Sequence, residues 1–270
     1  MNFVKLWHLV PQSLRDVINE KLHIQQFVLK IWIRRNAKEI KKFKDIGKGK
    51  RCFIIGNGPS LTLDDLEKLK EEDTFGSNYI FNLFDKTTWR PNYYFLQDYD
   101  YLRKMGWIPD KRVEECQAAF ISGACLKHRN GHRLKNEYFY YLNGAFAKKD
   151  DADFSKDITK NIHQGCTVTY SMIQAAVYMG YREIYLLGVD HNYPSSNGIK
   201  ENEKKLDYMK ELNLGFNWDN PPALHKSTVA YAKAREVCEG MGIKIFNATR
   251  GGKLEAFERC DIDKVLNGEG

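Results

Sequence analysis

The chain alternates between short apolar runs and longer amphipathic stretches. Phe53, Ile54 and Ile55 form an apolar run without polar alternation, which is typical of a strand buried on both faces of a parallel sheet. Comparable runs predict strands at 51–55, 74–77, 93–97, 118–122, 137–142, 183–187 and 243–246. Helical periodicity predicts helices near 62–71, 167–179 and 227–240. The alternation predicts an α/β fold with a doubly wound, mainly parallel, Rossmann-like sheet.

Two long segments do not follow this alternation. Residues 127–163 are polar and basic, and residues 193–224 begin with the polar stretch YPSSNGIKENEKK. Long excursions in a compact domain are usually lids or binding loops. We therefore expect a lid insertion at about 193–224.

The positive charge of the chain is concentrated at its N-terminus. Residues 1–51 carry 13 Lys and Arg against 4 Asp and Glu, a net charge of +9, whereas the whole chain carries +7. Their apolar and basic positions predict an amphipathic helix of the kind that lies on anionic membranes, and a helix packed on the domain with a solvated basic face is the equal alternative. We divide the chain into a basic N-terminal arm, 1–47, and a domain, 48–270. The domain offers no basic surface to continue a nucleic-acid footprint, so we expect no nucleic-acid binding.

Length and composition restrict the class of protein. A chain of 270 residues with 43% apolar content is long enough for one large domain with a lid. No apolar run approaches the roughly 20 residues of a membrane span, and no secretory signal is evident. The six cysteines are scattered without metal-binding spacing, which indicates reduced thiols and no zinc. We expect a cytoplasmic protein held peripherally at the inner face of the membrane by its arm.

The stretch RCFIIGNGPSL, residues 51–61, joins the first predicted strand to a glycine-rich turn. Gly56 and Gly58 permit close backbone approach, and Pro59 and Ser60 suit the first turn of a helix. Such a turn predicts free backbone N–H groups that point at one spot, where a nucleotide phosphate or ribose binds. The Asn57 amide both donates and accepts, which suits ribose or base recognition. A tight turn without a ligand is the alternative interpretation.

Polar groups follow four of the predicted strands. These groups are Gly56-Asn57-Gly58, Ser77-Asn78, Gln97-Asp98-Tyr99-Asp100 and Gly188-Val189-Asp190-His191-Asn192. In open α/β sheets, ligands bind beyond the carboxyl ends of the strands. Each group alone also suits a turn, but the four together predict a binding site at this edge of the sheet.

Five motifs carry a resemblance to a known family. IIGNGPSL, GSNYIF, TVTYSMIQAAVYMGY, REIYLLGVDHNY and LHKSTVAYAKAREV occur in this order. Over about residues 50–250 the chain resembles bacterial CMP-sialic acid-dependent sialyltransferases of the lipooligosaccharide type. A broader set of proteins, similar to archaeal 6-hydroxymethylpterin diphosphokinase, shares the first and fourth motifs and an ending like NATRGGKLEAF.

The resemblance implies a metal-independent, inverting transfer and therefore no cofactor. It implies His225 as the general base and tyrosine hydroxyls that support the departing phosphate, for which Tyr193 is the candidate. It implies nucleotide or donor contacts by Asn57, Gly58, Ser60, Asn78, Gln97, Thr167, Asp190 and Asn192. The sequence departs from the family at three places, with Asn192 where the tyrosine is expected, Gly165 where an arginine is expected, and Gln97-Asp98-Tyr99 in place of Asn-Pro-Gly.

The chemistry can also be argued from the residues themselves. An inverting transfer needs a base for the acceptor proton, and histidine titrates near neutral pH. His225 follows the predicted lid and precedes a predicted helix, although a capping or surface histidine has the same position. His191 directly follows Asp190, where it would orient that carboxylate. Arg250, in NATRGG, is a candidate partner for an acceptor or donor anion, or else part of a turn.

Asp98 and Asp100 follow a predicted strand with one residue between them. Many nucleotide-sugar transferases hold a metal ion with such a pair, and diphosphokinases need Mg²⁺ with ATP. A surface turn is the alternative. Metal binding by these two aspartates would indicate a Mg²⁺-dependent diphosphotransferase.

Three functions fit these observations. The first is a glycosyltransferase that moves a CMP-activated, sialic-acid-like sugar onto a polysaccharide, lipooligosaccharide or other glycan or glycolipid acceptor. The second is a Mg²⁺-dependent diphosphotransferase of the 6-hydroxymethylpterin diphosphokinase type, and the third is a non-catalytic polysaccharide assembly factor. The basic arm, as a contact to the membrane surface, fits the first and third better. A homo-oligomer is left open.

Overall fold

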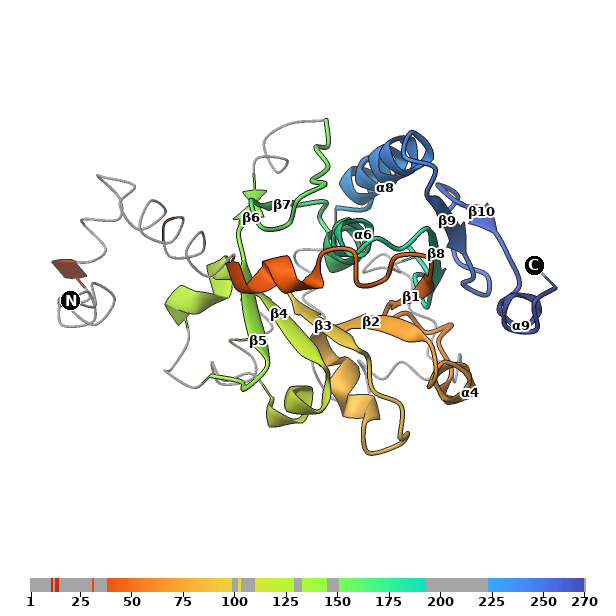
Figure 1. Cartoon of the computed structure of the whole chain (residues 1–270), viewed down its shortest axis with the longest axis horizontal. Helices are drawn as coiled ribbons and strands as arrows, with labels where there is room; N and C mark the ends of the chain where they lie inside the picture. The colour runs from red at the N-terminus through yellow and green to blue at the C-terminus, as the bar shows by residue number, and fades with distance from the viewer. Residues whose placement is uncertain are drawn as a thin grey trace, which may run out of the picture.

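The computed structural model describes residues 11, 13–14, 31, 38–98, 102, 110–128, 133–144, 151–192 and 223–269. Most of the predicted amphipathic helix of the arm, the predicted lid up to residue 222, Asp100 and Tyr193 lie outside these residues. An eight-stranded sheet forms the centre of the domain, and all its paired strands are parallel (Figure 1). The sheet order is β10-β9-β8-β1-β2-β3-β4-β5.

The strands of this sheet are β1 (Arg51–Ile55), β2 (Asp73–Ser77), β3 (Tyr93–Leu96), β4 (Ala118–Ser122), β5 (Glu137–Tyr140), β8 (Glu183–Leu187), β9 (Lys244–Asn247) and β10 (Glu258–Arg259). A second sheet pairs β6 (Leu142–Asn143) with β7 (Ile162–His163). The α-helices are α4 (Leu63–Lys68), α6 (Val168–Tyr178), α8 (Leu224–Glu239) and α9 (Ile262–Leu266). The 3-10 helices are η1 (Lys41–Phe43), η2 (Asn78–Leu83), η3 (Lys111–Glu115) and η4 (Gly123–His128).

The sheet is wound in two directions from its middle. The chain lays down β1 to β5 in one direction and then returns to place β8 beside β1, followed by β9 and β10. The predicted doubly wound, parallel α/β fold is therefore confirmed. The single strand predicted at 137–142 is wrong, because β5 ends at Tyr140 and Leu142–Asn143 pairs with β7 in the second sheet.

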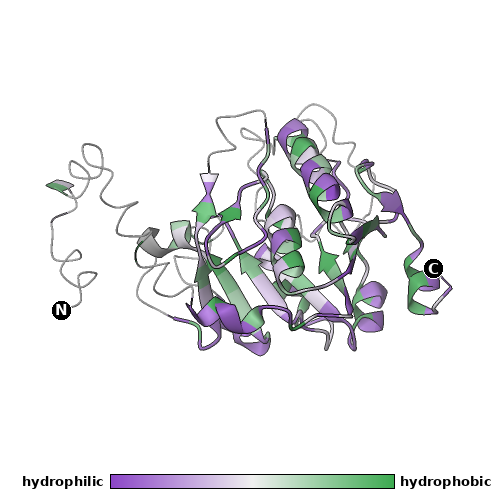
Figure 2. Ribbon diagram, turned by 45° about the horizontal axis from the view of Figure 1, so that its top comes forward, coloured by the Kyte–Doolittle hydropathy of each residue, from purple (hydrophilic) through white to green (hydrophobic). Residues whose placement is uncertain are grey.

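Helices cover both faces of the sheet. On one face, α6 and α8 pack on apolar side chains of the strands, and α6 is buried along nearly its whole length because α8 covers it (Figure 1). On the other face, α4, η2 and η3 close a second apolar cluster. Figure 2 shows the strands mainly in hydrophobic colours, as expected for a sheet buried on both faces.

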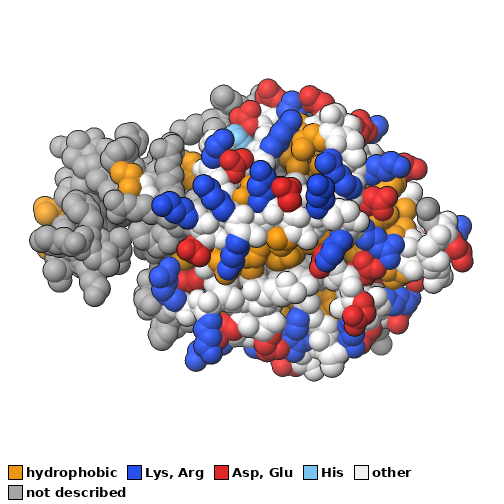
Figure 3. All heavy atoms as spheres, viewed as in Figure 1, with side chains coloured by type: hydrophobic (Ala, Val, Ile, Leu, Met, Phe, Trp, Pro, Cys, Tyr) orange, Lys and Arg blue, Asp and Glu red, His pale blue; other side chains and the backbone are white. Residues whose placement is uncertain are grey.

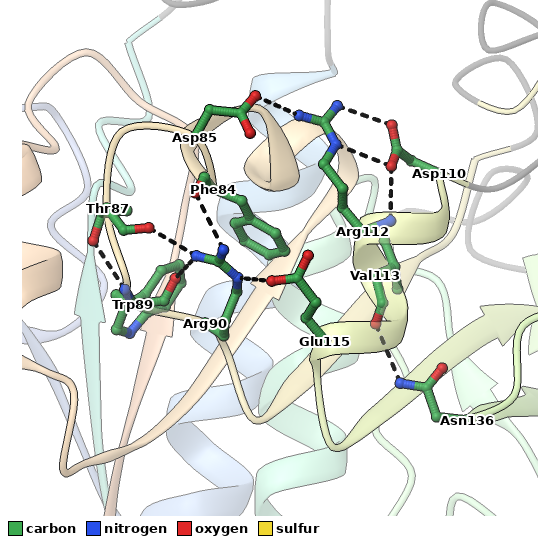
Figure 4. A network of polar contacts seen from close by, with 10 residues as sticks. All are labelled: Phe84, Asp85, Thr87, Trp89, Arg90, Asp110, Arg112, Val113, Glu115 and Asn136. Atoms are coloured by element: carbon green, nitrogen blue, oxygen red, sulfur yellow. Dashed lines mark hydrogen bonds and ion pairs between the residues drawn. The ribbon is translucent and has the colours of Figure 1, made fainter.

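Two arginines organise the loops that lead into β3 and β4 (Figure 4). Arg90 donates to the carbonyl oxygens of Phe84, Thr87 and Trp89 and, over 2.5 Å, to the Glu115 carboxylate. Arg112 makes ion pairs with Asp110 at 2.9 Å and Asp85 at 3.1 Å. The two guanidinium groups lie over the rings of Phe84 and Phe81, at 4.3 and 5.1 Å from the ring centroids. Asn136 joins the same group of contacts by donating to the Val113 carbonyl oxygen, and we call all these residues the arginine network.

A membrane-spanning helix was not expected from the sequence. Among the helices in the described ranges, none combines the length and the apolar composition that crossing a bilayer requires.

Candidate functional site

The carboxyl ends of β8, β1, β2 and β3 lie next to one another at one edge of the sheet. The winding reverses between β1 and β8, and in such sheets the reversal point is the usual place of a ligand. We call this edge the rim. It consists of residues 56–60, 77–78, 97–98 and 188–192, together with the N-terminal ends of α6 and α8.

The turn after β1 is held by the turn after β8. Gly56 and Gly58 donate their backbone N–H groups to the carbonyl oxygens of Leu187 and Gly188, at 2.7 and 2.8 Å. The Asp190 carboxylate accepts from the Ser60 hydroxyl at 2.7 Å and from the Ser60 N–H at 3.4 Å. The expectation of free N–H groups for a phosphate is therefore wrong for these three residues, because β8 and its turn already use them.

Gly58 is required by the approach of Asp190. A Cβ atom at position 58 would lie 1.9 Å from Asp190 Oδ2 and 2.7 Å from the Gly188 carbonyl oxygen. The turn after β9 fixes Asp190 from the other side, since Lys253 donates its backbone N–H to the Asp190 carbonyl oxygen at 2.7 Å. Three turns at the switch point are thus locked together through Asp190.

Asn57 and Asn78 lie in the turns that follow the paired strands β1 and β2. Asn57 donates its Nδ2 to the Ser77 carbonyl oxygen at 3.0 Å, and the Asn78 carbonyl oxygen accepts from the Tyr94 hydroxyl at 2.7 Å. Both Oδ1 atoms are buried, and neither has a hydrogen-bond donor in the described part of the chain. A buried acceptor without a donor costs free energy, so two of them in the turns after neighbouring strands are unusual at a site with no binding role.

Backbone strain also gathers at the rim. Among the described residues, four that are not glycine have a positive φ, and three of these belong to the rim or adjoin it. They are Asn78 at 54°, His191 at 49° and Cys166, which precedes the N-cap of α6, at 56°. Left-handed conformations of such residues are costly and are concentrated at functional sites.

The N-terminal end of α6 faces the carboxyl end of β3. Thr167 caps the helix by accepting from the Thr169 N–H at 3.3 Å. One turn into the helix, the Ser171 hydroxyl donates to Gln97 Oε1 at 2.5 Å, and both side chains are buried. Gln97 is therefore fixed by α6 as a polar group at the carboxyl end of β3. Ser171 was not predicted as a site residue. Its position four residues after Thr167 places it on the same face of the helix as that residue.

Two histidines lie at the N-terminal end of α8. The Thr228 hydroxyl donates to the Leu224 carbonyl oxygen at 2.9 Å, so its oxygen accepts from His191 Nε2, 2.8 Å away. This bond assigns the proton of neutral His191 to Nε2 and leaves Nδ1 as an acceptor. Burial lowers the pKa of His191 below 6.5. His225 is exposed in the first turn of α8, three residues before Thr228 and therefore on the same side of the helix.

Arg250 lies in an ion pair next to the rim. Its two terminal nitrogens bind the two oxygens of Asp65, both at 2.7 Å, and the Asp65 side chain is fully buried. Burial alone would raise the pKa of Asp65, but the hydrogen bonds from Arg250 and Thr62 outweigh it and hold this pKa below 3.8. The pair joins the start of α4 to the turn after β9. Asp65 had no sequence signal, because its partner lies 185 residues away.

The remaining predicted residues are less tightly placed. Asn192 is exposed at the end of the turn after β8. Asp98 is exposed at the end of β3, and after burial its charge is the second cause that raises the pKa of Tyr79 to about 12. Across the described ranges, His, Cys, Asp and Glu side chains do not gather in groups of three that would hold a metal ion.

Gly165 explains one departure from the sialyltransferase pattern. A Cβ atom at this position would lie 2.5 Å from the ring of Tyr170, which is fully buried. Tyr170 is held in place because its hydroxyl donates to the Asp153 carbonyl oxygen at 2.8 Å. The packing of Tyr170 therefore leaves no room for an arginine side chain at position 165.

Comparison with protein families identifies the family of this chain. The family described as 6-hydroxymethylpterin diphosphokinase MptE-like matches residues 30–196, which is more than half of the 270-residue chain. Comparison with curated protein sequences gives no match.

Three solved structures illustrate the range of structural likeness. The MAf glycosyltransferase from Magnetospirillum magneticum AMB-1 is 16% identical with a TM-score of 0.48, over 86% of this chain but 38% of that one. The sialyltransferase CstII from Campylobacter jejuni, in complex with cytidine-5'-monophosphate, is 18% identical with a TM-score of 0.43, over 78% and 85% of the two chains. The monofunctional alpha-2,3-sialyltransferase Cst-I from Campylobacter jejuni is 16% identical with a TM-score of 0.37, over 73% and 74%. These likenesses are too distant to assign an activity.

Proposed function

Because the chain belongs to the 6-hydroxymethylpterin diphosphokinase MptE-like family, we propose that it is a transferase whose rim binds a nucleotide-activated donor. The donor that we propose is a CMP-activated acidic sugar, and the acceptor is a hydroxyl group of a glycan or glycolipid. The GNGPSL and GVDHNY motifs support this choice, since the turns that they form are in direct contact through Asp190 and Ser60.

The unpaired Oδ1 atoms of Asn57 and Asn78 carry the proposal. Both are acceptors, so a ligand completes them only with hydrogen-bond donors. A phosphate oxygen has no hydrogen to offer at neutral pH, whereas the hydroxyls of ribose or of a sugar and the amino group of cytosine do. We therefore assign the sugar or nucleoside part of the donor to the two asparagines.

The transfer itself follows from the chemistry of an inverting displacement. The acceptor oxygen attacks the anomeric carbon, a new C–O bond forms, and the bond from that carbon to the phosphate oxygen breaks. CMP departs with the electron pair of that bond, and the acceptor proton passes to a base. His225 is the proposed base, and His191 on the same side of α8 is the second candidate, since its Nδ1 is an acceptor. Tyr193, proposed to support the departing phosphate, lies outside the described residues.

A diphosphotransferase is the second candidate, and the description of the family favours it. In this reaction an acceptor hydroxyl attacks the β-phosphorus of ATP and AMP departs. Mg²⁺ would neutralise the phosphates. Asp98 is one carboxylate at the end of β3, and the described residues do not complete a metal site around it.

A thermal-shift panel separates the candidates. The full chain is heated with CMP, CDP, UDP, GDP or ATP, each with and without Mg²⁺. A nucleotide at 100 times its dissociation constant stabilises by about 2.7 kcal/mol. We expect the largest shift with a cytidine nucleotide and no dependence on Mg²⁺. A shift with ATP and Mg²⁺ alone favours the diphosphotransferase, and no shift with any nucleotide contradicts the proposal and favours the non-catalytic assembly factor.

A further inference from the structure

Residues 38–50, which we call the basic segment, are built into the domain by apolar contacts. Ile40 is fully buried, and Phe43 is 8% exposed. The Phe43 ring packs edge-on against Tyr93, Phe120 and Tyr138, with ring centroids 6.2, 5.0 and 4.8 Å away. The segment therefore crosses β3, β4 and β5 on the face that α6 also covers (Figure 1).

Backbone hydrogen bonds hold the second half of the basic segment against the end of α6. Asp45 and Gly47 donate their N–H groups to the carbonyl oxygens of Tyr178 and Met179, at 3.4 and 2.8 Å. The Lys50 carbonyl oxygen accepts from the Arg182 N–H at 3.4 Å. With both halves fixed, the outward side chains of the segment form a defined surface.

This surface is strongly basic. The segment exposes six lysines, which are Lys38, Lys41, Lys42, Lys44, Lys48 and Lys50. It contains only two acidic residues, Glu39 and Asp45. Within the described part of the chain, five of the six lysines make no ion pair, and only Lys50 pairs, with Asp73. Lys42 donates to the Tyr138 hydroxyl. Figure 3 shows Lys and Arg side chains gathered along this face.

An exposed apolar side chain lies within the basic surface. Ile46, between Lys44 and Lys48, is 41% exposed. The other large hydrophobic residues that are exposed among the described ones are Leu14 and Ile31, which precede the segment in the chain. Basic residues elsewhere, such as Arg51, Arg90 and Arg112, have acidic partners. The basic segment therefore has both unpaired positive charge and an exposed large apolar side chain. In the other described parts of the chain these two features do not occur together.

We propose that the basic segment docks the protein on an anionic membrane surface, with the lysines at the lipid headgroups and Ile46 inserted between them. Anionic lipids attract clustered lysines, and the boundary between headgroups and acyl chains accepts an apolar side chain. A polyanion such as RNA would satisfy the lysines but would leave Ile46 in water. The combination thus favours a lipid surface over a nucleic acid.

Docking in this orientation leaves the rim open. The basic segment contacts the C-terminal end of α6, at Tyr178 and Met179, whereas Thr167 caps the other end at the rim. The 11 residues of α6 separate the two, and a helix of this length spans about 16 Å. Membrane binding and nucleotide binding therefore use opposite ends of one helix and do not compete.

Vesicle sedimentation of the full chain tests the proposal. The test variant carries Lys41→Glu, Lys44→Glu and Lys48→Glu. The control variant carries Lys111→Glu, Lys135→Glu and Lys264→Glu, which are equally exposed lysines outside the segment and give the same change in net charge. Vesicles of phosphatidylcholine with 30% phosphatidylglycerol, pure phosphatidylcholine vesicles and poly(U) are the three probes, and melting temperatures confirm that both variants fold.

We expect the wild type to bind the anionic vesicles and not the neutral ones. The test variant should lose about 100-fold or more in affinity, because each charge near an anionic surface contributes roughly fivefold. The control variant should stay within about threefold of the wild type, and Ile46→Ser should weaken vesicle binding without changing poly(U) binding. Equal losses in the two triple variants, full vesicle binding by the test variant, or no effect of Ile46→Ser would overturn the proposal. A nucleotide affinity that falls when vesicles are bound would contradict the orientation.

Discussion

The rim and the arginine network both contain asparagines with an unpaired, buried Oδ1 atom, but their surroundings differ. In the network, Asn136 donates to the carbonyl oxygens of Val113 and Cys116 at 3.2 and 2.6 Å, and its neighbours have ordinary backbone angles (Figure 4). At the rim, two asparagines with an unpaired Oδ1 atom, Asn57 and Asn78, follow the neighbouring strands β1 and β2, and Asn78 has a left-handed backbone.

The difference shows which observation identifies a site. The single unpaired acceptor of Asn136 has a structural explanation. The Asn136 amide group is needed as a donor to two carbonyl oxygens, and its own oxygen is left without a partner as a result. Two unpaired acceptors after neighbouring strands at the rim, one of them on a left-handed backbone, have no comparable structural benefit. We infer that the network exists for stability and the rim for a ligand.

The largest expected effect is the loss of stability in Arg250→Ala, which tests whether Arg250 belongs with the structural groups or with the ligand site. The variant leaves the Asp65 carboxylate buried without its cation. We expect the free energy of unfolding to fall by about 2 to 4 kcal/mol, less than for a fully buried pair because the Arg250 side chain is 44% exposed. Urea denaturation measures this change.

Arg235→Ala is the matched control, since Arg235 forms an exposed pair with Glu239. Its cost should stay below about 0.5 kcal/mol. The pKa of Asp65 is below 3.8 in the folded state, so the ion pair contributes its stability above pH 3.8 and loses it as the pH falls further. A cost of Arg250→Ala equal to that of the control would mean that Arg250 is free to serve a ligand.

A smaller effect is expected for Gly58→Ala, which disturbs the rim without touching the network. The new methyl group would meet Asp190 Oδ2 and force the turns after β1 and β8 apart. We expect a loss of about 1 to 3 kcal/mol in stability and at least a tenfold loss in nucleotide affinity. Gly240→Ala, where the nearest atom is 3.5 Å from a new Cβ, should be neutral or slightly stabilising. Normal nucleotide affinity in Gly58→Ala would separate this turn from the site.

The smallest effect concerns the pH dependence of stability. Burial lowers the pKa of His191, so the unfolded chain takes up a proton before the folded chain as the pH falls below 6.5. His191 therefore destabilises the fold on acidification, and the contribution is absent at higher pH. We expect His191→Asn to reduce the fall in melting temperature between pH 7 and pH 5. An unchanged pH profile would contradict the burial of His191 at the rim.

Much of the sheet was predictable, because its central strands are continuous apolar runs. The predictions at 51–55, 118–122 and 183–187 agree with β1, β4 and β8 at both ends. The small strands β6, β7 and β10 have two residues each, which is too short for any periodicity. They depend on pairing with distant segments and had no local signal.

The sequence predicted which residues gather at the rim better than what they do there. The motif GNGPSL indicated a phosphate-binding turn, but a carboxylate 130 residues away accepts the hydrogen bonds of Ser60. Likewise, the hydrogen bond from Ser171 to Gln97 forms only because β3 and α6 lie next to each other in the folded chain. Such pairings are set by tertiary structure, so motif spacing cannot reveal them.

Calorimetric titration of CMP into four proteins tests the central claim most directly. These are the wild type, Asn57→Ala, Asn78→Gly and the network control Asn136→Ala. Asn78→Gly removes an unpaired acceptor and should leave the stability within about 1 kcal/mol of the wild type, whereas Asn57→Ala also removes the donor to the Ser77 carbonyl oxygen and should cost about 1 to 2 kcal/mol. In both rim variants the lost ligand bond should weaken CMP binding by about 1 to 3 kcal/mol. Asn136→Ala should lose stability and keep the wild-type affinity. Wild-type affinity in both rim variants, or an equal loss in Asn136→Ala, would contradict the assignment of the rim as the nucleotide site.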